Sequence, residues 1–252
     1  MTSKEILIFD ISSEYGHFRK YNTTTSPLTY SIPTRTAIAG IAGAILGMER
    51  ETAAGKYPEG AEPVQEFFSK EKSGIAVQIM NPVKKENMAI NLINTKRSFY
   101  DLTKAGRTQI EFELLKDAGF RIFFHHKDQK ILDELTERIK KKNYHFSPYL
   151  GLAQYTATVD FVERVSAELR VNTNNDYIEI ITAVNLTMTE GDAPVAFDNS
   201  AFYTANNMPI EMNRNREVQE YSEVLIEKNG KPVKAKVKEY FFVKNHGNIL
   251  FL

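Results

Sequence analysis

Five histidines are the residues best suited to chemistry in this chain: His17, His125, His126, His145 and His246. A histidine near a tyrosine or lysine can move the protons when a ribose 2′-hydroxyl attacks the adjacent phosphodiester of RNA, a reaction that needs no metal. The candidate sets are His17 with Tyr15 and Lys20, and the pair His125 and His126 with Lys127. The sequence has no Walker loop, nucleophile elbow or dinucleotide fingerprint.

Composition and spacing argue against metal and thiol chemistry. The chain has no cysteine, which removes disulfides, thiolate nucleophiles and cysteine-based zinc sites. The histidines do not show the spacing of metal ligands, with or without nearby carboxylates. We therefore expect no metal and no cofactor. RNA cleavage by His17, or by His125 and His126, is kept as the enzymatic alternative to a protein without catalysis.

A polar and aromatic segment, residues 12–31, could bind single-stranded RNA. It is too polar for a core and too aromatic for a plain linker. Cations suit phosphates, hydroxyls suit sugar and phosphate oxygens, and aromatic rings stack on bases. The alternative is a long loop held by its own hydrogen bonds. The candidate RNA contacts in this segment are His17, Arg19, Lys20, Tyr21, Thr23, Thr24, Thr25, Ser26 and Tyr30.

Charge is balanced overall but unevenly distributed. The chain has 32 basic and 32 acidic residues, yet residues 96–107 are basic and aromatic while residues 190–223 are strongly acidic. A protein with one RNA-facing side and other sides facing proteins would have this pattern, although a flexible basic loop is equally compatible with the charge alone. The basic candidates in this stretch are Lys96, Arg97, Lys104 and Arg107.

The segment Ile32–Arg50 reads as a helix that begins near Pro33, because proline suits a first helical turn. Its apolar residues recur at the helical period on one face: Ala37, Ile38, Ile41, Ala42 and Ile45. Gly40, Gly43 and Gly47 form a second stripe, and each costs about 1 kcal/mol in a helix interior. We expect close approach of another backbone or a ligand there. Arg35 in the first turn opposes the helix dipole, so we expect a phosphate or carboxylate nearby.

The order of the remaining elements predicts an α+β fold. Strands are expected at 4–11, 74–81, 88–96, 108–115 and 119–125, a short helix at about 64–70 and a helix from Asp128, which is a good N-cap. This order suits a ferredoxin-like or RRM-like domain over residues 1–155. From residue 156 to 252 we expect a smaller β-rich lobe with strands at 159–171, 177–186, 220–227 and 237–243, and a hairpin at Asn229-Gly230.

The hydropathy pattern gives no sign of membrane insertion. No apolar run reaches the roughly 18 residues of a membrane-spanning helix, and the N-terminus lacks a signal pattern. We therefore expect a cytoplasmic protein with no membrane partner.

Two motifs and a central segment resemble the CRISPR-associated Cas family five, which caps the 5′ handle of guide RNA (crRNA) in type I Cascade complexes. The first motif is Ile32-Pro33-Thr34-Arg35-Thr36 followed by Gly40, Gly43, Leu46 and Gly47. The second is Ser147-Pro148-Tyr149-Leu150-Gly151. The central segment is Arg107–Phe124. Together they cover roughly residues 4–155.

The resemblance implies a non-catalytic RNA-binding subunit with an RRM-like fold. Its partners would be crRNA, a Cascade backbone subunit, the large subunit, and target DNA near the protospacer-adjacent motif. Residues 96–107 would form a thumb in which Phe99 and Tyr100 stack or wedge, and Thr34 and Tyr149 would line the handle site. Arg19, Lys20 and Arg35 would contact phosphates, and Tyr21 or Tyr30 would contact bases.

Within the family, the polar loop and the His-His-Lys strand end resemble the type I-B members most. The processing ribonucleases of type I-C carry a Tyr/Lys/His set that these histidines do not match residue by residue. Two alternatives stay open at this point: a metal-independent endoribonuclease that processes precursor crRNA, and an RRM-like protein-interaction module that binds no RNA.

Overall fold

The computed structural model describes residues 3–20, 26–49, 51, 55–93, 106–197 and 201–252. A four-stranded antiparallel unit lies at its centre, in the spatial order β5-β1-β4-β2, with two helices in the connections. This order and these crossovers define the predicted ferredoxin-like, RRM-like fold. The elements are β1 (Ser3–Gly16), α1 (Arg35–Leu46), β2 (Ser73–Ile79), β4 (Arg107–His126), α3 (Gln129–Lys140) and β5 (Thr158–Val171).

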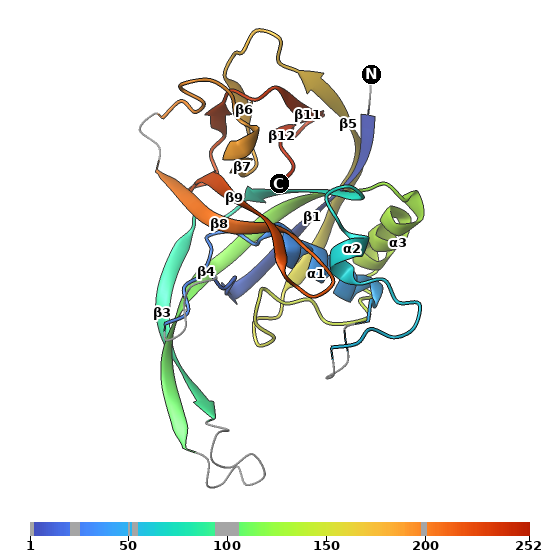
Figure 1. Cartoon of the computed structure of the whole chain (residues 1–252), viewed down its shortest axis with the longest axis vertical. Coiled ribbons are helices and arrows are strands. Elements are labelled where there is room, and N and C mark those ends of the chain that lie inside the picture. The colour runs from blue at the N-terminus through green and yellow to red at the C-terminus, as the bar shows by residue number, and fades with distance from the viewer. Residues whose placement is uncertain (1–2, 21–25, 50, 52–54, 94–105, 198–200) are drawn as a thin grey trace.

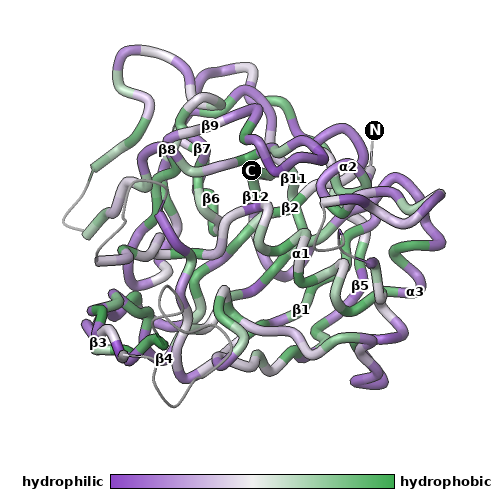
Figure 2. The backbone as a smooth tube through the Cα atoms, turned by 60° about the horizontal axis from the view of Figure 1, so that its bottom comes forward, coloured by the Kyte–Doolittle hydropathy of each residue, from purple (hydrophilic) through white to green (hydrophobic). Residues whose placement is uncertain are grey.

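The central strand β1 is buried on both faces. Leu7, Phe9 and Ile11 pack in one cluster with apolar residues of α1 and α3, and Ile6 and Ile8 pack in a second cluster on the other face. This alternation follows from the period of two along a strand. Figure 2 shows the resulting hydrophobic interior along β1 and the helices.

Helix α1 begins at Arg35, two residues later than the prediction from Pro33. Thr34 has an extended backbone, and its side chain accepts a hydrogen bond from the Ala37 N–H at 3.1 Å, which makes it the N-cap. Gly47 ends the helix in the left-handed conformation with φ of 83°. The predicted cap of α3 is confirmed, since Asp128 accepts a hydrogen bond from the Lys130 N–H at 2.9 Å.

Strand β4 is one continuous strand of 20 residues, whereas the sequence predicted two strands at 108–115 and 119–125. Its second half pairs with β1 and β2, and its first half pairs with β3 (Lys84–Ile93). The β3–β4 pair extends away from the body as an arm (Figure 1). Lys116 pairs with β1 and β3 and Ala118 pairs with β1, so β4 continues across Asp117, which has no ladder partner and a φ of 50°.

The C-terminal half extends the large sheet beyond β5 and forms a second, separate sheet. The large sheet has the path β10-β6-β12-β11-β5-β1-β4-β2, with β3 paired to β4, and a separate sheet has the order β7-β9-β8. These elements are β6 (Ile178–Ile180), β7 (Val184–Asn185), β8 (Phe202–Met212), β9 (Val218–Glu227), β10 (Val233–Ala235), β11 (Glu239–Val243) and β12 (Gly247–Ile249), with α2 (Val64–Phe67) and a 3-10 turn (Leu186–Met188).

The predicted hairpin at Asn229-Gly230 is wrong. The turn joins β9 to β10, but β9 pairs with β7 and β8, while β10 pairs with β6 in the other sheet. The buried Glu227 carboxylate accepts hydrogen bonds from the Asn229 and Lys231 N–H groups at 2.8 Å. The turn therefore directs the chain from one sheet to the other. The predicted strand 177–186 is likewise divided into β6 and β7, and β8 was not predicted.

The two predicted units are joined by backbone hydrogen bonds. β5 lies beyond residue 155, yet it pairs with β1 from Ser3 to Ser12 as the fourth strand of the ferredoxin-like unit. The division into residues 1–155 and 156–252 stays a prediction about folding units. Within the described ranges, no helix is long and apolar enough to cross a membrane.

Candidate functional site

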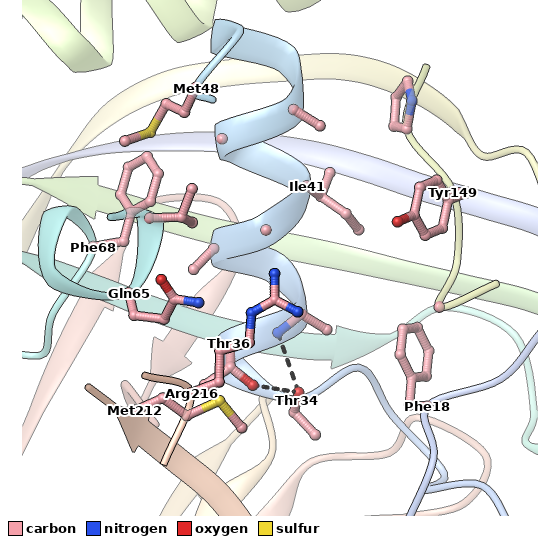
Figure 3. A pocket seen from close by; sticks show the side chains of 18 of the residues that line it. Phe18, Thr34, Thr36, Ile41, Met48, Gln65, Phe68, Tyr149, Met212 and Arg216 are labelled. Atoms are coloured by element: carbon pink, nitrogen blue, oxygen red, sulfur yellow. Dashed lines mark hydrogen bonds between the residues drawn. The ribbon is translucent and has the colours of Figure 1, made fainter. Parts of the chain in front are cut away.

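An open groove with a volume of about 1100 Å³ runs along the outer face of α1. Figure 3 shows α1 at its centre, with Phe18 and Tyr149 on one side and Gln65 and Phe68 on the other. We call this site the α1 groove. Its lining comes from the loop after β1, from α1 and from the following residues: Met48, Glu49, Glu51, Tyr57, Pro58, Val64, Gln65, Phe68, Phe112, Phe146, Ser147, Pro148, Tyr149, Gly151, Leu152, Pro209, Met212 and Arg216.

The helix face that forms the floor of the α1 groove lacks the charged and amide side chains of a typical surface helix. No charged or amide side chain occurs between Thr36 and Leu46, although solvent-facing helix positions are normally polar. Ala37, Gly40 and Ala44 line the groove, and Gly40 is exposed. A helix face of small residues lets another molecule approach the backbone closely.

Aromatic side chains form the walls of the groove. Tyr149 and Phe146 are 39% and 48% exposed, so both rings are available to a ligand. Phe112 comes from the base of the arm and contacts the His17 ring edge-on, with centroids 5.3 Å apart. Exposed rings suit flat ligands that can stack on them, such as nucleobases.

The groove contains charged groups and hydroxyls near the start of α1. Thr34 is the N-cap of α1 and Thr36 lies in its first turn, and Arg19 also lines the groove. Figure 3 shows Arg216 beside Thr36, and Arg216 forms an ion pair with Glu51 at 2.6 Å. Thr34 Oγ1 and Thr36 Oγ1 are 3.0 Å apart (Figure 3). Anionic ligand groups are therefore favoured near the start of the helix, where the dipole also helps.

Arg35 has a different role from the predicted phosphate contact. Its side chain is 2% exposed, and Nη2 donates hydrogen bonds to Phe68 O at 2.9 Å and to Ser73 O and Oγ at 3.1 and 2.9 Å. Burial lowers its pKa to about 10, while the charges of Glu211 and Glu220 act in the opposite direction. Oxygen atoms of Phe68, at the end of α2, and of Ser73, at the start of β2, thus accept hydrogen bonds from the guanidinium that we expected to bind a phosphate. Nη2 therefore has a structural role where the sequence predicted a phosphate contact, and Nε takes no part in these hydrogen bonds.

His17 is buried beside the groove in a defined tautomer. Its Nδ1 lies 2.8 Å from Glu113 O, and because a carbonyl only accepts, Nδ1 carries the proton. Nε2 is therefore an acceptor, and it has no hydrogen-bond partner among the described atoms. Burial lowers the pKa of His17, which favours this neutral form.

The Leu150-Gly151 part of the second motif holds the backbone at His17. The His17 N–H donates to Leu150 O at 3.0 Å, and the Leu150 side chain is fully buried. Gly151 has φ of 84°, and a Cβ there would lie 1.8 Å from His17 O. The motif therefore requires glycine at this position for steric reasons. In the same motif, Tyr149 presents its ring to the groove.

The described parts of the loop after β1, residues 17–20 and 26–34, are joined by backbone hydrogen bonds. Lys20 N–H donates to Leu28 O and Tyr30 N–H to Phe18 O, both at 2.8 Å. Tyr30 is 2% exposed and its hydroxyl donates to Asn207 O at 2.6 Å. This burial corrects the prediction that Tyr30 stacks on a base. Arg19 and Ser26 are exposed on the same loop.

Several predicted contacts fall on other parts of the molecule. Arg107 is exposed at the start of β4, at the far end of the arm from the body. The following predicted residues lie outside the described ranges: Tyr21, Thr23, Thr24, Thr25, Lys96, Arg97, Phe99, Tyr100 and Lys104. The α1 groove also contains aromatic residues that the sequence did not single out, namely Tyr57, Phe112 and Phe146.

His125 and His126 have structural partners at the other end of β4. His125 Nδ1 donates to Glu5 O at 2.9 Å, and His126 Nε2 lies 3.2 Å from Phe67 O while its ring stacks on Phe67. His17 contacts Glu113, and His126 lies 13 residues further along that strand, about 40 Å of extended chain. The two candidate catalytic sets are therefore separate. Within the described ranges, no group of three metal-ligating side chains occurs.

We expect stability to fall when the pH drops below 6.5. Burial is the main cause of the lowered pKa of His17 and His125, and Arg19 acts in the same direction on His17, as Lys4 does on His125. The unfolded chain therefore binds these protons at a higher pH than the folded chain does, so unfolding is favoured as pH falls through the ordinary value of 6.5. Urea denaturation at pH 7.5 and 5.5 measures this loss, and His17→Asn should reduce it. A midpoint that is constant across this range would contradict the expectation.

The comparisons with known proteins concern the family and the fold. A family model described as CRISPR-associated protein (Cas_Cas5) matches residues 6–224. A chain of a CRISPR RNA-guided surveillance complex has 12% identity and a TM-score of 0.52, covering 92% of this chain and 91% of that chain. A CRISPR protein from Archaeoglobus fulgidus has 12% identity and a TM-score of 0.51, covering 98% and 100%. No curated protein matches the chain.

The fold and the groove define an RRM-like protein that carries a hairpin arm and additional C-terminal strands. The structural likenesses support this fold, and the family match spans 219 of the 252 residues, from 6 to 224. The chain belongs to the CRISPR-associated Cas5 family.

Proposed function

We propose that this chain is a subunit of a type I CRISPR surveillance complex that binds the 5′ handle of crRNA without cutting it. The α1 groove is the observation that carries this proposal, because it combines exposed rings, hydroxyls and Arg19 around a floor that lacks large side chains. Single-stranded RNA sites need rings for bases and cations or hydroxyls for the backbone. The type I-B assignment rests on the sequence motifs and is part of this proposal.

The proposed partners fit the remaining surfaces. The arm, with apolar Met88, Ile90 and Leu92 on one side of β3, would meet the adjacent backbone subunit. The C-terminal strands would meet the large subunit and lie near target DNA at the protospacer-adjacent motif. In this arrangement the handle occupies the α1 groove and Arg107 contacts RNA from the tip region of the arm.

We expect the double variant Arg19→Ala/Lys20→Ala to bind handle RNA more weakly with a smaller salt dependence. Each phosphate contact on a single strand contributes about 0.7 to the slope of log K against log salt concentration, so two lost contacts lower it by about 1.4. Fluorescence anisotropy with labelled RNA that carries the repeat-derived handle measures both quantities. Lys130→Ala/Lys238→Ala removes the same charge from exposed residues outside the groove.

Two outcomes of this experiment would change the proposal. Equal losses in the two double variants would mean that general charge, and not the groove, determines affinity. If the RNA affinity of the unchanged chain does not depend on salt concentration, the protein-interaction module is favoured, because phosphate contacts are strongly salt-dependent.

A metal-independent endoribonuclease is the second candidate, and His17 is the observation that favours it. A neutral histidine with an unpartnered Nε2 can accept the proton of a 2′-hydroxyl. Incubation of the chain with repeat RNA in EDTA separates the candidates. A discrete cut that His17→Asn abolishes would establish the nuclease, and intact bound RNA would support the handle-binding subunit.

A further inference from the structure

Gly40 is a helix-interior glycine whose missing side chain leaves a space that the described chain does not fill. Glycine in the middle of a helix lowers its stability relative to alanine. A Cβ at Gly43 would lie 3.0 Å from Val64 Cγ2, and Gly47 ends α1 with φ of 83°, so the fold itself accounts for both. A Cβ at Gly40, in contrast, would meet no described atom within 4 Å.

The two buried side-chain nitrogens without a partner belong to residues that line the same groove. Among the described residues these atoms are His17 Nε2 and Arg35 Nε, and both side chains are 2% exposed. Buried polar atoms are nearly always hydrogen-bonded, so each unpaired atom calls for an explanation. Nε2 of neutral His17 is an acceptor and Nε of Arg35 is a donor.

These two observations point to a ligand that offers both a hydrogen-bond donor and an acceptor. The ribose–phosphate chain of RNA carries a 2′-hydroxyl, which donates, and phosphate oxygens, which accept, at every nucleotide. An acceptor such as His17 Nε2 would repel a bare phosphate but pair with a hydroxyl. The exposed rings of Tyr149 and Phe146 stand at the groove wall and leave the floor free for the sugar.

We infer that the ribose–phosphate chain of bound single-stranded RNA packs directly on the backbone of α1 at Gly40. This inference rests on the proposed function and assigns the position of closest approach within it. The contact is steric, so it depends on the absence of a side chain at residue 40 and not on its charge. Gly40 is a positioning residue for the RNA strand along the groove.

Gly40→Ala and Gly40→Leu test the contact in a graded way. Neither added side chain meets a described atom of the fold at its Cβ, so we expect both variants to fold and to melt at or above the temperature of the unchanged chain. Overpacking a close contact should weaken binding of labelled handle RNA by about 10- to 100-fold for leucine, with a smaller loss for alanine. Fluorescence anisotropy gives the affinities, and thermal unfolding gives the stabilities.

Gln219→Leu is the control, because it adds an apolar side chain at an exposed and uncharged position outside the groove. The inference is overturned if Gly40→Leu binds RNA as tightly as this control. It is also overturned if Gly40→Leu unfolds and the folded Gly40→Ala variant binds like the unchanged chain. If the unchanged chain itself binds no handle RNA, the proposed function fails. If Arg19→Ala/Lys20→Ala weakens binding and the Gly40 variants do not, only this inference fails.

Discussion

Arg35→Ala is expected to lower the free energy of unfolding by about 3 kcal/mol or more. The substitution removes hydrogen bonds from a charged donor, each of which contributes about 1.5–3 kcal/mol. It also leaves a space where a fully buried side chain joined α1 to Phe68 and Ser73. Urea denaturation followed by far-ultraviolet circular dichroism measures the loss.

Arg35→Met and Arg35→Lys separate volume from hydrogen bonding. Methionine fills much of the space and avoids the cost of burying a charge, a cost that the lowered pKa of Arg35 reflects. Lysine keeps the charge but lacks the planar fork, whose Nη2 donates to Phe68 and Ser73 while Nη1 lies 3.5 Å from Ile210 O. We expect both variants to be more stable than Arg35→Ala. An Arg35→Ala protein with unchanged stability and lost RNA binding would instead restore the phosphate contact predicted from the sequence.

Gly151→Ala should have the second large effect, a loss of about 3 kcal/mol or more. A left-handed backbone costs a residue with a Cβ roughly 1–2 kcal/mol. The remainder comes from displacing His17, whose carbonyl oxygen lies 1.8 Å from the position of the new Cβ. Because His17 N–H also bonds Leu150 O, the displacement should disturb the groove as well as the fold.

Gly191→Ala is a matched control for the backbone conformation. Gly191 has the same φ of 84°, but a Cβ there meets only Asn175 Nδ2, at 3.9 Å. The difference between the two variants in urea denaturation therefore isolates the steric contribution at Gly151. Equal losses in both would show that the segment around His17 moves aside freely and does not fix the groove.

The sequence was sufficient for elements whose determinants are local. The cap at Asp128, the helix around Gly40 and the order of elements that gives the RRM-like unit all depend on neighbouring residues or on short periodicities. The turn at Asn229-Gly230 was predicted, but the pairing of the strands on either side of it was not. That pairing depends on contacts with strands that are distant in the sequence. The same limitation divided β4 into two predicted strands.

The site was predictable in outline only. The motif residues Thr34, Tyr149 and Gly151 line the same groove, and RNA binding there stays a prediction. Burial decided the cases that went wrong, because a cation such as Arg35 and a ring such as Tyr30 look alike in a sequence whether they face solvent or the interior. Phe112 and Phe146 come from segments whose meeting at the groove only the tertiary fold reveals.

The continuity of β4 has a mechanical consequence. Residues of the arm and residues beneath the groove belong to one unbroken strand, and Glu113 on that strand accepts a hydrogen bond from His17 through its carbonyl oxygen and from the Thr29 N–H through its carboxylate. The arm and the groove wall are therefore parts of the same strand, with one unpaired residue, Asp117, between the arm and the strand's pairing with β2. A neighbouring protein that binds the arm would therefore constrain the orientation of the α1 groove relative to that protein.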